Sequence, residues 1–76
     1  MNAQRRKMLG KVIDLISEAR MLLEDVKDEE QEAFDNMPES LQASERGETM
    51  EDAISTMDDI ISSLEDAEIE LEEVRS

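Results

Sequence analysis

Apolar residues recur every three or four positions along two long segments of this chain, residues 3–33 and residues 45–75. That spacing is typical of one face of an α-helix. Between the segments, the stretch from Phe34 to Gly47 holds the only Phe, the only Pro and one of the two Gly. Because Pro and Gly interrupt helices, the chain is expected to reverse there. The sequence therefore predicts a single all-α domain, an antiparallel two-helix hairpin with a turn over residues 34–47 that contains a short helical segment.

The heptad pattern also predicts which side chains form the core. Positions a of the two helices are Leu9, Ile16, Leu23, Glu30, Met50, Met57, Leu64 and Leu71, and positions d are Val12, Ala19, Val26, Ala33, Ala53, Ile60, Ala67 and Val74. In a coiled-coil arrangement these two rows face the partner helix. We therefore expect Ile16, Leu23, Ile60 and Leu64 to be buried.

The apolar stripes are wider than a two-helix seam requires. Met8, Leu15 and Leu22 extend the first stripe at position g with Ile13 at position e, and Ile54 and Ile61 extend the second at position e. A lone hairpin is expected to leave Met8, Leu15, Leu22, Ile54 and Ile61 partly exposed. Two interpretations follow: a homodimer that forms a four-helix bundle, or a face that is covered by another protein.

The charge of the chain is unevenly distributed. Residues 1–20 carry five bases and two acids, a net charge of +3, whereas residues 21–76 carry three bases and twenty acids, a net charge of −17. An antiparallel hairpin is expected to bring Arg5, Arg6, Lys7 and Lys11 near Glu65, Glu68, Glu70, Glu72 and Glu73. A surface this acidic repels nucleic acid and anionic membranes. We therefore expect no direct nucleic-acid binding, and because charged residues interrupt the longest apolar region, we expect no transmembrane span.

Catalytic chemistry is poorly represented. The chain has no His and no Cys, and no nucleophile–base pair is recognisable among the remaining side chains. Glu-x-x-His motifs, an EF-hand loop and a Gly-rich phosphate loop are all missing. The sequence therefore predicts a protein that is not an enzyme and binds no cofactor or metal.

The turn contains the residue types of a structured loop. Pro38 is suited to the first position of a short helix with Asn36 or Met37 as its cap, and either Ser44 or Thr49 is suited to cap the second long helix. The turn has two interpretations. Phe34, Met37 and Leu41 fold over the end of the hairpin as a hydrophobic plug, or the loop recognises a partner. The candidate partner-binding residues are Asp35, Asn36, Met37, Pro38, Glu39, Leu41, Gln42 and Arg46.

The same stretch resembles a group of small acidic proteins encoded by bacteriophages and prophages. In that group a run of the form Asn-x-Pro-Glu-(Ser/Asn)-Leu-Gln, followed by Ser-Glu-Arg, lies between two predicted helices; here these are residues 36–42 and 44–46. The resemblance implies a phage origin and action in the bacterial cytoplasm, and it assigns no catalytic residue.

Three functions are consistent with these features. The first is an inhibitor or modulator that binds a bacterial host protein, such as one of anti-phage defence, through its turn or its apolar face. The second is an acidic nucleic-acid mimic that blocks a DNA- or RNA-binding protein, with Asp58, Asp59, Glu65 and Asp66 as its surface. The third is an oligomeric bundle that sequesters a small nucleotide signal through Arg46 and the N-terminal bases.

Overall fold

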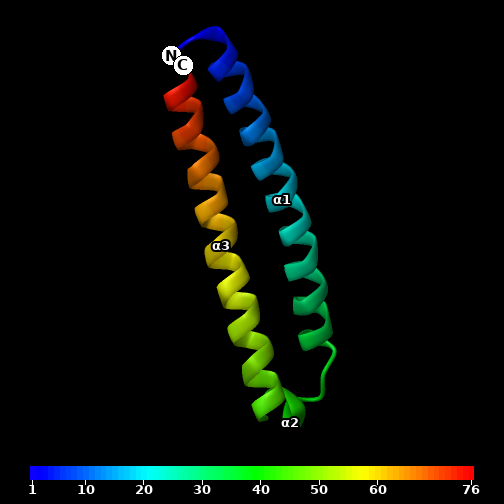
Figure 1. Ribbon diagram of the computed structural model, residues 1–76. Coiled ribbons are helices and arrows are strands. Elements are labelled where there is room, and N and C mark those ends of the chain that lie inside the picture. The colour runs from blue at the N-terminus through cyan, green and yellow to red at the C-terminus, as the bar shows by residue number, and fades with distance from the viewer.

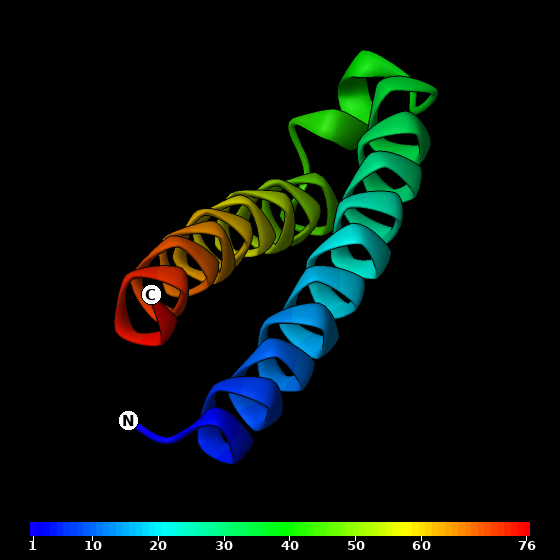
Figure 2. The same ribbon diagram turned by 90° about the horizontal axis from the view of Figure 1, so that it is seen from above.

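The structure is an antiparallel hairpin of two long helices. The computed structural model describes all of residues 1–76 and contains α1 (Ala3–Asp35), α2 (Glu39–Gln42) and α3 (Glu45–Arg75). α1 and α3 lie side by side, with both termini at one end and α2 at the other (Figure 1). The molecule is a rod of 58 × 14 × 12 Å. Figure 2 looks along this rod from the end where the termini lie. The predicted all-α hairpin is confirmed.

Short polar side chains set the starts of both long helices. The Asn2 side chain accepts a hydrogen bond from the backbone N–H of Arg5 at 2.8 Å and caps α1. Of the two candidates for the cap of α3, Ser44 is the N-cap: its hydroxyl accepts from the backbone N–H of Gly47 at 3.4 Å. Thr49 lies inside the helix and donates to the carbonyl of Glu45. Such caps satisfy backbone donors that have no partner within the helix.

The seam between α1 and α3 is formed by rows a and e of the heptad. Its members on α1 are Ile13, Ile16, Arg20, Leu23, Lys27, Glu30 and Phe34, and on α3 they are Met50, Ile54, Met57, Ile61, Leu64, Glu68 and Leu71, all of them buried or half-buried. Ile13 and Ile61 are the only buried large side chains, with 8% and 6% of their surface exposed. The hairpin by itself therefore has very little core.

Part of the predicted core is wrong. Ile16, Leu23 and Leu64 are half-buried, but Ile60 is 44% exposed, and Ile61, which was expected to be partly exposed, is buried. The physical reason is that each helix has one neighbour. Rows a and e lie on either side of the line of contact, whereas row d lies about a quarter of a turn away from it at 100° per residue.

Gly10 lies near the C-terminal end of α3. It is half-buried where the last turn of α3 crosses it, and a Cβ at this position would lie 2.6 Å from Nη1 of Arg75. The side chain at the end of α3 therefore occupies the space that a larger residue would fill.

Candidate partner-binding surfaces

A run of exposed apolar side chains lies along α1. We call it the outer stripe, and its residues are Met8, Val12, Leu15, Ala19, Leu22 and Val26, all of them exposed. The exposed fractions of Met8, Leu15 and Leu22 are 58%, 64% and 66%. The spacing of the stripe alternates four and three residues, which is the spacing of a helix-packing seam. At its N-terminal end, Met1, Arg5, Met8, Leu9 and Val12 line a hollow of about 320 Å³.

α3 contributes a second and weaker apolar row to the same side of the hairpin. This outer row is formed by Ala53, Ile60, Ala67 and Val74. On each helix, row d lies about a quarter of a turn from the seam, in the same rotational sense along the chain. Because the two helices run in opposite directions, the two d rows face the same side of the hairpin. The hairpin thus has one apolar side, on which α1 supplies the large side chains and α3 supplies mainly small ones.

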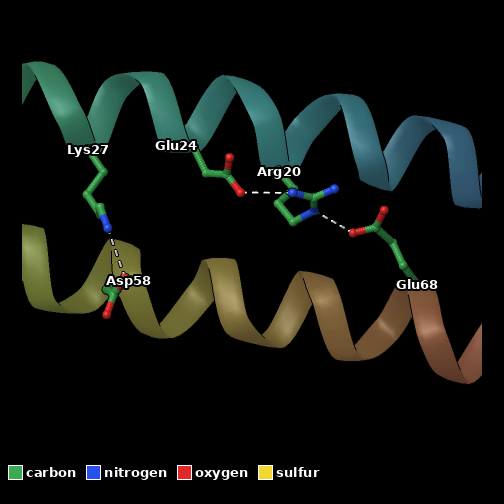
Figure 3. Close-up of polar contacts among 5 residues, drawn as sticks. All are labelled: Arg20, Glu24, Lys27, Asp58 and Glu68. Carbon is green, nitrogen blue, oxygen red and sulfur yellow. Dashed lines mark hydrogen bonds and ion pairs between the residues drawn. The ribbon is translucent and has the colours of Figure 1, made fainter.

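Ion pairs bridge the seam in its middle third (Figure 3). Nε of Arg20 donates to Glu68 across the seam at 2.6 Å, and Nη1 of Arg20 donates to Glu24 on its own helix at 2.8 Å. Nζ of Lys27 donates to Asp58 at 3.0 Å. The hydrogen bond from Arg20 lowers the pKa of Glu68. The pKa of Arg20 is raised, mainly by its hydrogen bond to Glu68 and secondly by its hydrogen bond to Glu24. Asp58 in turn raises the pKa of Lys27.

These ion pairs differ from the predicted ones. Arg5, Arg6, Lys7 and Lys11 form no ion pair, and of the five predicted glutamates only Glu68 pairs across the seam, with Arg20. All four bases are exposed, and the half-buried or buried positions near the start of α1 are Leu9, Gly10 and Ile13. These pairs could have been predicted from the heptad pattern if row e had been assigned to the seam, because Arg20, Lys27 and Glu68 all occupy row e.

The turn is held by backbone and side-chain hydrogen bonds. Nε2 of Gln42 donates to the carbonyl of Phe34 at 3.0 Å, and the Ser44 hydroxyl donates to the carbonyl of Leu41. Pro38 is the N-cap of α2 rather than its first helical residue, and its carbonyl accepts from the N–H groups of Leu41 and Gln42. The end of the hairpin is therefore a defined structure rather than a loose loop.

Gly47 explains how the turn fits against α3. It is buried, and a Cβ there would overlap the carbonyl group of Gln42, with the Cα atom of Gln42 only 2.7 Å away. The glycine therefore permits the close approach of the Gln42 backbone to α3. Its φ is not positive, so the need for Gly is steric.

The candidate turn residues divide into two groups. Met37 and Gln42 are half-buried, as is Phe34 of the seam. The exposed members are Asp35, Asn36, Pro38, Glu39, Leu41 and Arg46. Leu41 is 45% exposed, so it is not the buried plug residue that one interpretation required. The exposed group presents acidic side chains, one basic side chain, one amide and the aliphatic side chain of Leu41 at the structured end of the hairpin.

The four residues of the proposed mimic surface, Asp58, Asp59, Glu65 and Asp66, are all exposed. Asp58 is engaged by Lys27, and the other three form no ion pair. No three acidic side chains converge in a metal-binding arrangement, and no helix contains a stretch apolar enough to cross a membrane. Comparisons of the chain with models of protein families, with curated proteins and with solved structures find no match.

Proposed function

We propose that this chain is a non-catalytic protein-binding hairpin that acts as a homodimeric four-helix bundle in the bacterial cytoplasm. In this proposal it captures a host protein with the turn at the end of each hairpin and thereby inhibits or modulates that protein. The observation that carries the proposal is the apolar side of the hairpin, where the outer stripe of α1 remains uncovered although the hairpin has almost no core.

The energetic argument concerns burial. Full burial of a Val, Leu or Met side chain contributes about 1.5–3 kcal/mol. A hairpin with Ile13 and Ile61 as its only buried large side chains gains little from this term, while eleven large apolar side chains are exposed. A chain of this size commonly relies on a disulfide, a metal or association for stability. The chain has no Cys for a disulfide and no cluster of side chains arranged to hold a metal, which favours association.

The geometry of the stripes supports a bundle. A helix in a four-helix bundle contacts two neighbours about a quarter of a turn apart. α1 has two apolar stripes with that separation: the seam facing α3, which contains Ile13 and Ile16, and the outer stripe. In a bundle, row d of both helices is then covered, so that Val12, Val26 and Ile60 join the core.

The turn supplies the part of the proposal that concerns a target. Asp35, Asn36, Glu39, Leu41 and Arg46 are exposed at the end of the rod, while Gly47, Gln42 and Ser44 hold the backbone beneath them. A recognition surface held by a rigid scaffold loses little conformational entropy on binding. The resemblance to phage-encoded proteins at residues 36–46 favours a bacterial protein as the target.

A second candidate is the acidic mimic. α3 carries twelve acids and two bases, and Asp59, Glu65 and Asp66 form no ion pair. This surface favours a partner with a basic groove. Its binding would depend steeply on salt because the attraction acts between exposed charges.

One capture experiment tests the turn against the mimic. The tagged protein is incubated with bacterial lysate as the unmodified chain, as a turn variant (Asn36→Ala, Glu39→Ala, Arg46→Ala) and as an acid variant (Asp58→Asn, Asp59→Asn, Glu65→Gln, Asp66→Asn). We expect the turn variant to lose the captured protein while its helicity and self-association stay unchanged, and the acid variant to retain it. Capture by the turn variant at full strength would contradict recognition by the turn, and loss with the acid variant would favour the mimic.

A further inference from the structure

We infer that the outer stripe of α1 pairs antiparallel with the outer stripe of α1 in a second copy of this chain. The inference rests on the proposed function, because it specifies how the two hairpins of the dimer meet. It places α1 beside α1 at the centre of the contact, rather than α1 beside α3.

The chemistry of the two outer surfaces favours this pairing. On α1, the row furthest from the seam on the apolar side carries Met8, Leu15 and Leu22. The corresponding row on α3 carries Thr49, Thr56, Ser63 and Glu70. Large apolar side chains gain most when they are buried against other apolar side chains. The surface in this chain that meets that condition for the outer stripe is another copy of the same stripe.

The charge along α1 determines the direction. Residues 1–20 carry a net charge of +3, and residues 21–35 carry one base and seven acids, a net charge of −6. An antiparallel pair places each basic half beside the acidic half of the other copy, whereas a parallel pair places like charges together. Arg5 and Lys11, which border the outer stripe, have no ionic partner within the hairpin and are available for this contact. A two-fold contact of this kind is self-complementary.

The spacing of the stripe specifies a register. Centring the two-fold axis near Ser17 pairs Val12 with Leu22, Leu15 with Ala19 and Met8 with Val26 of the other copy. Each of these pairs joins two apolar side chains from the two copies, and the large side chain of Leu15 packs against the small side chain of Ala19. The same register sets Arg5 opposite Glu29 at each end of the stripe, both of which are exposed in the hairpin. It also sets Lys11 beside Asp25 on the flank.

The arrangement has a consequence for target binding. With the axis near Ser17, the two copies of Asp35 lie roughly 55 Å apart along the helices at 1.5 Å per residue. The two turns therefore lie at opposite ends of the dimer and face away from each other. Such a dimer binds two target molecules, or two sites on a long target, with one turn at each site.

Spin-label distances test the direction of the pairing in the intact chain, which contains no Cys of its own. Ala3→Cys and Asp14→Cys each place one nitroxide on the side of α1 away from both stripes. In the inferred register the two Ala3 labels are separated by roughly 42 Å along the helix axis, and the two Asp14 labels by roughly 9 Å. A parallel pair gives equal distances at both positions and would overturn the inference while leaving the dimer intact. The absence of a dipolar signal between labels at micromolar concentration would overturn the dimer itself, and with it the proposed function.

A disulfide experiment tests whether α1 lies directly beside α1. Mixing Val12→Cys with Leu22→Cys under oxidising conditions should yield the mixed covalent dimer, because a disulfide requires Cα atoms within about 7 Å. Val12→Cys alone should yield little covalent dimer, since the two copies of residue 12 lie roughly 15 Å apart along the axis. Cross-linking of Val12→Cys with itself, or a dimer that shows no mixed product, would contradict the inferred pairing.

Discussion

Nε of Arg20 lies 2.6 Å from Oε2 of Glu68, so that a single guanidinium joins the middle of α1 to the last third of α3. Nη1 of the same residue binds Glu24 at 2.8 Å. Both Arg20 and Glu68 occupy the seam, where the other members are mostly aliphatic. An aliphatic seam tolerates sliding by a heptad, whereas a charge pair satisfies both partners in one register. We interpret the pair as the feature that sets how α1 and α3 are aligned.

The first prediction concerns Glu68. Glu68→Gln should lower the free energy of unfolding at neutral pH, whereas the matched change Glu65→Gln on the exposed side should leave it unchanged or raise it. The lowered pKa of Glu68 means that its stabilising contribution is complete above the ordinary pKa of Glu and is lost as the pH falls through the lowered value. Denaturant titrations over a series of pH values should therefore show a full difference between wild type and Glu68→Gln at pH 7 that shrinks as the pH falls below the ordinary pKa of Glu. A difference that does not change with pH would contradict the assignment.

The second prediction concerns the charge of the whole chain. With a net charge of −14, repulsion among carboxylates destabilises the folded state at neutral pH. The melting temperature should rise when the pH is lowered from 7 to about 5, and it should also rise with added salt at pH 7 because salt screens the repulsion. At still lower pH the rise should reverse as the pH falls through the lowered pKa of Glu68 and its pairing with Arg20 is lost. A fall in melting temperature in both the pH 7 to 5 series and the salt series would show that specific ion pairs outweigh the repulsion.

The two glycines should respond in opposite ways to replacement by Ala. At Gly10 the obstacle is the end of the flexible Arg75 side chain, which can move, so Gly10→Ala should stabilise the protein by about 0.5–1 kcal/mol through helix propensity. At Gly47 the obstacle is the backbone of Gln42, so Gly47→Ala should destabilise it by about 1–3 kcal/mol. Chemical denaturation of both variants checks the pair. Equal effects at the two positions would contradict the close approach of the turn to α3.

The buried isoleucines provide the fourth prediction. Ile61→Ala should cost about 2–5 kcal/mol of stability, since the side chain is 6% exposed at the seam. Ile69→Ala, the same change at an exposed position on α3, should stay within about 0.5 kcal/mol. Urea titrations of the two variants provide the comparison. A loss at Ile69 as large as that at Ile61 would mean that the buried face of α3 has been assigned incorrectly.

Much of the fold follows from local features of the chain. The heptads predicted two long helices, and Pro38 with Gly47 located the turn, because these signals depend on residues a few positions apart. Which rows form the seam could not be derived in the same way. Rows a, d and e are all apolar in part, and the choice among them depends on whether one neighbour or two is present. Ile60 was therefore assigned to the core, although it is exposed. Ile61 was expected to be partly exposed, although it is buried.

The candidate surfaces were predictable to a smaller extent. Leu41, Glu39 and Arg46 were identified from the composition of the turn, and all three are exposed. The pairing of Arg20 with Glu68 was missed, because contacts between residues 48 positions apart depend on the alignment of the helices. The position of Gly47 against the backbone of Gln42 likewise depends on the course of α2.

Sedimentation equilibrium of the unmodified chain at micromolar concentration tests the central claim most directly. We expect the mass of a dimer, twice 8.7 kDa. Leu15→Glu, which places a charge in the outer stripe, should shift the protein to monomer or unfold it. The matched change Met21→Glu on the other side of α1 should leave the dimer intact. A wild-type chain that sediments as a folded monomer over the whole concentration range would contradict the account.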